Sequence, residues 1–151
     1  MFSPGYQLKS ARTLKRLVLR MYVVFRQLAI DYLSSENFQY AITYDGWSNN
    51  RLKGFYPMTL HWVDLESGKR INLLLYFLDV FPGDGVGKRV GQVLFMRLKS
   101  FGFSLHLIST TSDGASDAMV ATKELAKLLH IHHGRDILPS DHMLRCMVHT
   151  Y

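Results

Sequence analysis

The sequence has little of what would mark a secreted or membrane protein. It contains one cysteine, Cys146, so no internal disulfide can form and a reducing compartment is expected. No apolar run reaches the roughly 18 residues that a membrane-spanning helix needs. Residues 1–10 also lack the apolar core of a signal peptide. We therefore expect no membrane partner.

Acidic residues are scarce relative to basic ones, with 12 Asp and Glu against 18 Lys and Arg, a net charge of +6 and a pI near 9.5. This balance suits an anionic partner such as DNA, although many basic proteins bind none. It predicts weak, salt-sensitive, sequence-independent DNA binding. At 151 residues and 48% hydrophobic, the chain is expected to form a globular domain with a sizeable core.

Two stretches share one pattern, a β-rich run that ends in an aspartate. In residues 39–50, Tyr40, Ile42 and Tyr44 alternate with smaller or polar residues, and Asp45 follows where a polar, glycine-containing turn begins. Residues 104–113 repeat this pattern and end in Asp113. If the two strands are neighbours, the two aspartates lie side by side.

The rest of the chain predicts alternating elements. A helix is expected over residues 14–33, capped by Ser10 or Thr13, with a basic side that is either solvated or in contact with phosphates. A fully buried strand is expected over residues 70–80, and residues 81–87 are expected to be a connector, since they contain no phosphate-binding loop. The other expected elements are strands at 55–64 and 142–150, helices at 90–101 and 115–129, and a loop at 130–140 with three histidines.

This order gives an amino-terminal helical segment, residues 1–37, followed by β-β-β-α-β-α-β over residues 38–151. We expect one α/β domain with a mixed sheet covered on both faces, in the ribonuclease-H-like arrangement. In that arrangement the first strand is central and the fourth strand lies beside it. Asp45 and Asp113 are then adjacent at one end of the sheet.

Four blocks resemble the catalytic domain of hAT-family transposases. They are TYDGW at residues 43–47, FYPMTLHWVD at 55–64, STTSDGASDAM at 109–119 and RCMVH at 145–149. Their order matches the family pattern from about residue 38 to the end of the chain. Each block alone is weak, whereas four in order are a stronger signal.

The resemblance implies a DDE-type enzyme that cuts and joins DNA, with Asp45 and Asp113 as the first two catalytic and metal-binding acids. Mg²⁺ or Mn²⁺ is the implied cofactor, because paired divalent ions stabilise the charge of phosphodiester cleavage and hard ions prefer carboxylate oxygens. In such transposases the third acid, a glutamate, follows a large helical insertion, so we expect it beyond Tyr151. The resemblance also implies a nuclear location in a eukaryote, and an oligomer for the full-length protein.

Several residues depart from the pattern or have a simpler interpretation. Gly114 and Asp117 stand where the family commonly has asparagines. Trp47, Cys146 and His149 match family positions but are more simply structural, and one cysteine with one histidine cannot complete a zinc site. Two main hypotheses remain: a fragment of a transposase core, or a decayed or domesticated relative that binds nucleic acid or protein without catalysis. Another ribonuclease-H-like nuclease is a weaker third.

Overall fold

The computed structural model describes residues 10–35, 39–48, 54–80, 83–134, 136 and 142–146. It divides into two compact units, Met1–Asn37 and Phe38–Tyr151, which are described separately. Among the described residues, no helix has both the length and the apolar character required to cross a membrane.

The first unit contains one long helix, α1 (Ala11–Ser35), which extends beyond the predicted range at both ends. Ser10 caps it as predicted: the Ser10 hydroxyl accepts a hydrogen bond from the backbone N–H of Thr13 at 3.2 Å. The Ser10 carbonyl accepts the first helical bond, from Leu14, at 2.9 Å.

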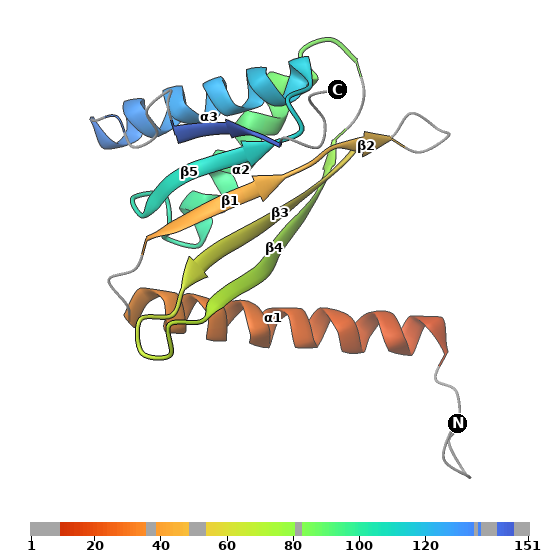
Figure 1. The fold of residues 1–151 in the computed structure, drawn as a ribbon. Helices are drawn as coiled ribbons and strands as arrows, with labels where there is room; N and C mark the ends of the chain where they lie inside the picture. The colour runs from red at the N-terminus through yellow and green to blue at the C-terminus, as the bar shows by residue number, and fades with distance from the viewer. Residues whose placement is uncertain are drawn as a thin grey trace. The chain divides into compact units, whose positions relative to one another are not determined.

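The second unit is an α/β domain built on a mixed sheet of six strands (Figure 1). The strands are β1 (Tyr40–Tyr44), β2 (Trp47–Ser48), β3 (Gly54–Val63), β4 (Arg70–Val80), β5 (Leu107–Ser112) and β6 (Met143–Arg145). The order across the sheet is β2-β3-β1-β5-β6, and β4 pairs with β3. β1–β5 and β5–β6 are parallel, whereas β1–β3 and β3–β4 are antiparallel.

The short strand β2 was not predicted, because residues 45–50 were expected to form a polar turn. Tyr44 of β1 pairs with Met58 of β3, and Trp47 of β2 pairs with Phe55, which is the same register. The chain therefore continues along β3 after an interruption of two residues, Asp45 and Gly46.

Two helices, α2 (Val86–Ser100) and α3 (Ser116–His133), cover one face of this sheet (Figure 1). Tyr44 and Tyr76 both pair with Met58 and so share a face. The Tyr44 hydroxyl donates to a carbonyl of α3 at 2.7 Å, and Arg97 of α2 donates to the Tyr76 hydroxyl at 2.6 Å. Fully buried side chains fill the space between, among them Tyr40, Ile42, Met58, Leu60, Leu94 and Leu125.

The expectation that helices of this unit cover both faces is wrong for its described part. The two crossovers, β4–α2–β5 and β5–α3–β6, advance in the same direction across the sheet. Crossovers between parallel strands are almost always right-handed. Successive crossovers in one direction place their helices on one face.

The expectation that residues 70–80 are buried on both faces is also wrong. The predicted bounds of this strand are confirmed, but β4 pairs only with β3 among the described strands. Leu74 and Phe77 are exposed, whereas Leu75 and Leu78 are buried. An apolar sequence alone did not distinguish an edge strand with one covered face from a central strand with two.

α2 begins four residues earlier than predicted, because Gly87, the last residue of the predicted connector, is part of the helix. Gly87 and Gly91 lie one turn apart and face α3. A Cβ atom on Gly91 would lie 2.5 Å from the carbonyl oxygen of Ala121, and one on Gly87 would clash with the carbonyl oxygen of Asp117. The two helices therefore approach each other closely enough to exclude any side chain at these positions.

α3 extends to His133, so the three histidines predicted in a loop lie in its last turn. Gly134 ends the helix with φ +69°, and its N–H donates to the His130 carbonyl at 2.8 Å. In the sequence, the end of this helix is marked by Gly134 and not by the histidines. The last strand, β6, is described only over Met143–Arg145, and residues 147–150 of the predicted strand lie outside the described residues.

Candidate functional site

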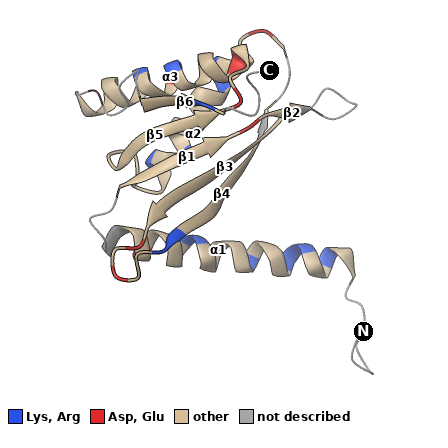
Figure 2. Cartoon of the chain, viewed as in Figure 1, with Lys and Arg blue, Asp and Glu red and all other residues tan. Residues whose placement is uncertain are grey.

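Asp45 and Asp113 follow adjacent parallel strands at the same end of the sheet. β1 and β5 pair in parallel as far as Thr43 opposite Thr111, and Asp45 and Asp113 each follow two residues beyond this last pair. In Figure 2 the red segments that follow β1 and β5 lie at this end. The predicted adjacency of the two strands is confirmed, and the closeness of the two carboxylates stays a prediction.

Both carboxylates are held locally and remain accessible. Asp45 is exposed, and its Oδ1 accepts a hydrogen bond from the N–H of Gly46 at 2.7 Å. Asp113 is half-buried, and its Oδ1 accepts from the N–H of Ala115 at 3.0 Å, which shapes the turn into α3. The second oxygen of each carboxylate, Oδ2, has no hydrogen bond to a described residue, so one oxygen from each strand end is available to a ligand.

Tyr56 of β3 lies near the end of the sheet that carries Asp45 and Asp113, called here the acidic end. This tyrosine was not singled out from the sequence. Burial raises the pKa of Tyr56, and the negative charges of Asp117 and Asp113 raise it further. The Tyr56 ring packs against Gly46, where a Cβ atom would overlap it. The sequence signal was the glycine directly after the first acid, which leaves room for a ring from the neighbouring strand.

Tyr44, the last residue of β1, connects the strand that precedes Asp45 to α3. Its hydroxyl donates to the Ala118 carbonyl and contacts the Thr122 hydroxyl. Burial raises the pKa of Tyr44, the hydrogen bonds of Thr122 and Ser112 lower it, and the charge of Asp113 raises it again. Tyr44 thus links the end of β1 to the first turns of α3, the helix that follows Asp113.

Residues at the end of β6 pack against the turn that follows Asp113. Gly114 has φ +79°, a left-handed conformation that glycine adopts freely and asparagine more readily than most residues. The methylene groups of Arg145 lie over it, because a Cβ atom on Gly114 would be 3.4 Å from Arg145 Cδ. The N–H of Cys146 donates to the Ser112 carbonyl at 2.6 Å and extends the β5–β6 ladder. Cys146 is half-buried, and His149 lies outside the described residues.

Trp47 lies two residues beyond Asp45 in an aromatic cluster on the sheet face away from α2 and α3. Its ring centroid is 5.3 Å from Phe77 in an edge-to-face arrangement and 6.0 Å from Phe55, and Phe55 and Phe77 are 5.7 Å apart. About half of Trp47 is exposed (49%), so it packs on one side and presents the other to solvent.

The donor chemistry suits a hard divalent ion, although the set of ligands is small. Carboxylate oxygens are what Mg²⁺ and Mn²⁺ prefer, and Asp45 and Asp113 each offer one. Within the described ranges, no three His, Cys, Asp or Glu side chains are grouped so that they could hold a metal ion. The three helical histidines are not such a group: His130 pairs with Asp136 at 2.8 Å, and His133 hydrogen-bonds Ser104 at 2.9 Å.

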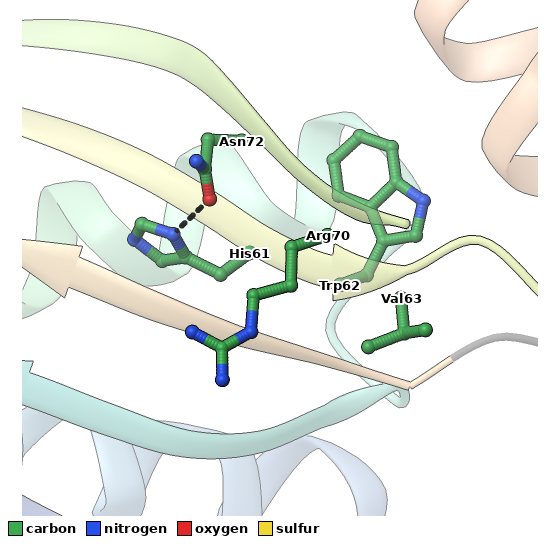
Figure 3. Close-up of a pocket in the computed structure, with 5 residues that line it drawn as sticks. All are labelled: His61, Trp62, Val63, Arg70 and Asn72. Atoms are coloured by element: carbon green, nitrogen blue, oxygen red, sulfur yellow. Dashed lines mark hydrogen bonds between the residues drawn. The ribbon is translucent and has the colours of Figure 1, made fainter. Parts of the chain in front are cut away.

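A pocket of about 330 Å³ lies at the other end of the sheet, near the β3–β4 turn (Figure 3). It is lined by His61, Trp62, Val63, Arg70 and Asn72. His61 Nδ1 donates to Asn72 Oδ1 (Figure 3), and His61 Nε2 hydrogen-bonds the Thr43 hydroxyl, both at 2.7 Å. His61 of β3 thus joins three strands, because Thr43 belongs to β1 and Asn72 to β4.

Comparison with known proteins adds no family assignment: a scan against protein-family models and a search of curated proteins each found no match. The resemblance to hAT transposases therefore rests on the four sequence blocks.

Proposed function

We propose that residues 38–151 form part of a ribonuclease-H-like catalytic core of the hAT transposase type, in which Asp45 and Asp113 bind Mg²⁺ or Mn²⁺. One observation carries the proposal: β1 and β5 are adjacent parallel strands, and Asp45 and Asp113 each follow two residues beyond their last pair. The element order and the mixed sheet are consistent with this fold. The partner is DNA and, in a eukaryote, the location is the nucleus.

The turn after Asp113 gives further support. The family commonly has asparagine where this chain has Gly114. Because φ is positive there, glycine and asparagine are the two residues that best suit the position. The departure at Gly114 thus preserves the backbone conformation. Asp117 lies in the first turn of α3, where a negative charge is favourable.

The residues have separate roles in this proposal. Asp45 and Asp113 hold the divalent ion, which would stabilise charge on the attacking and leaving oxygens of a phosphodiester. Gly46 admits the Tyr56 ring, which covers the chain next to Asp45. The Tyr44 hydroxyl ties β1 to α3 and so fixes the separation of the two strand ends.

The second candidate is a relative that binds nucleic acid or protein without catalysis. The favouring observation is that no third metal-binding side chain joins the two aspartates among the described residues. A two-ion site needs more ligands to fix both ions and the geometry of attack. We therefore expect that the 151-residue chain, by itself, does not nick supercoiled plasmid.

Titration with Mn²⁺, followed by electron paramagnetic resonance, tests the metal site. We expect weak binding that Asp45→Asn and Asp113→Asn each reduce at least about tenfold, because each removes one of two charged ligands. Asp84→Asn, at an exposed aspartate in the loop before α2, is the matched control and should leave binding unchanged. Equal binding by all three variants would refute the site.

Plasmid nicking in Mg²⁺ or Mn²⁺ separates the two candidates. Nicking by the intact chain that Asp45→Ala and Asp113→Ala both abolish would show an active enzyme completed by another acid, with Asp117 the first to test. Metal binding without nicking is the expected result.

A further inference from the structure

The exposed face of α1 carries a regular apolar stripe. Six residues alternate in spacings of four and three, and each is between 42% and 63% exposed. They are Leu14, Val18, Met21, Phe25, Leu28 and Tyr32, called here the α1 stripe. This spacing is the heptad pattern by which one helix packs against another.

The stripe is wide and free of charge. At about 3.6 residues per turn, it and its apolar flanks, including Leu17, Tyr22 and Val24, span roughly 160° of the helix. The charged side chains of α1 lie outside this arc: Arg12, Lys15, Arg16, Arg20, Arg26 and Asp31. Among the described side chains of α1, Leu33 is the only buried one, and it lies off the stripe.

The stripe offers a sizeable apolar area. Its aromatic side chains each have roughly 150–250 Å² to bury and its aliphatic ones less, and those of the stripe and its flanks are about half exposed. Together the nine side chains offer several hundred Å² per helix, which approaches the roughly 800 Å² that one partner contributes to a standard protein interface.

We propose that the α1 stripe binds the α1 stripe of a second copy of this chain, in an antiparallel pair with twofold symmetry. The spacing of the stripe is symmetric about residue 23. In the pair, Leu14 therefore meets Tyr32 of the second copy, and Val18 and Met21 meet Leu28 and Phe25. Every layer is filled by two apolar residues, so the surface is complementary to itself.

The distribution of charge selects the antiparallel orientation. Four of the five basic residues of α1 lie in its first half, where Figure 2 shows most of the blue segments of this helix. Asp31 lies near its other end. A parallel pair would place the two basic halves together. An antiparallel pair places each basic half beside the less basic half of its partner, which lowers the repulsion.

Light scattering on the full chain at micromolar concentrations tests the proposal, with a matched pair of substitutions. Val18→Glu adds a charge within the stripe, and Val23→Glu adds the same charge at an equally exposed valine outside it, 63% against 65% exposed. We expect a dimer for the natural chain and for Val23→Glu, and a monomer for Val18→Glu. Tryptophan fluorescence should be unchanged, since Trp47 and Trp62 both lie in the second unit. A monomeric natural chain, or two substitutions with the same effect, would overturn the proposal.

Disulfide cross-linking gives an answer that does not depend on a destabilising charge. In a Cys146→Ser background, which removes the natural thiol, Leu14→Cys chains mixed with Tyr32→Cys chains should form mixed dimers on oxidation. Leu14→Cys chains alone should not, because 18 residues of helix separate the two thiols by about 27 Å in the antiparallel pair. Cross-linking of Leu14→Cys with itself would show a parallel pair. Binding of a monomeric chain to phosphatidylserine vesicles, lost in Val18→Glu alone, would assign the stripe to a lipid surface instead.

Discussion

The close contact between α2 and α3 predicts that adding one methyl group at Gly91 destabilises the second unit. A Cβ atom there would lie 2.5 Å from the Ala121 carbonyl oxygen and 2.8 Å from Glu124 Cβ. Ordinary C···O contacts are about 3.3 Å or longer, so the helices would have to separate by roughly 1 Å. The atom that must move first belongs to the backbone of α3 and cannot turn aside.

The magnitude follows from two opposing terms. Alanine in place of glycine stabilises an unobstructed helix position by about 0.5–1 kcal/mol. Overpacking a close-packed contact costs about 1–3 kcal/mol. We therefore expect Gly91→Ala to lower the free energy of unfolding by about 1–2 kcal/mol. Gly87→Ala should act similarly, and the double variant should lose less than the sum, because helices already separated by one methyl group accommodate the second.

Urea unfolding followed by tryptophan fluorescence is a suitable assay, because both tryptophans lie in the second unit. Lys88→Ala, at an exposed position in the same helix, is the control and should change stability by less than about 0.5 kcal/mol. If Gly91→Ala is as stable as the natural chain or more so, α2 and α3 do not approach each other as described.

Two further predictions concern single polar groups. Thr110→Val should stabilise the chain by up to about 1 kcal/mol, because the buried Thr110 hydroxyl has no hydrogen-bond partner among the described residues. Thr122→Val should cost about 1 kcal/mol, because the Thr122 hydroxyl contacts Tyr44 and donates to a backbone carbonyl at 3.1 Å; equal effects in urea unfolding would contradict both. Asp117→Asn and Asp113→Asn should each lower the pKa of Tyr56, Asp117→Asn by more, because each removes a charge that raises it. NMR titration of ¹³C-labelled tyrosine measures the pKa of Tyr56, whose signal is assigned by its loss in Tyr56→Phe. An unchanged pKa in both variants would show that the charges of Asp113 and Asp117 do not act on Tyr56.

The sheet and its central pair of strands were predictable because local and long-range signals agree there. The alternation in residues 40–44 defined β1, and the turn around Gly68 set the start of β4. The order of strands and helices then matched the ribonuclease-H-like arrangement, in which the strand before Asp113 lies beside the first strand. The pairing of β1 with β5 followed from that order, with no information from side-chain contacts.

The features that were missed depend on partners distant in sequence. Gly87 suits a helix only because α3 lies against it, and local propensity treats a glycine as a breaker. The exposure of Phe77 depends on which strand ends the sheet, and composition does not encode this. Tyr56 lies near Asp113 and Asp117 because β3 pairs with β1 and β2, and the block at residues 55–64 contains Tyr56 without marking it as close to the acids.

The break between β1 and β2 has an evolutionary consequence. β1, before Asp45, and β2, after it, pair with β3 in the same register. This pairing fixes the backbone at Asp45 without help from the carboxylate. The exposed Asp45 side chain has one described hydrogen bond, to the neighbouring Gly46. Folding therefore does not require an acid at this position. If Asp45 binds metal as proposed, a lineage released from that chemistry can lose the acid by a single substitution and keep a folded domain.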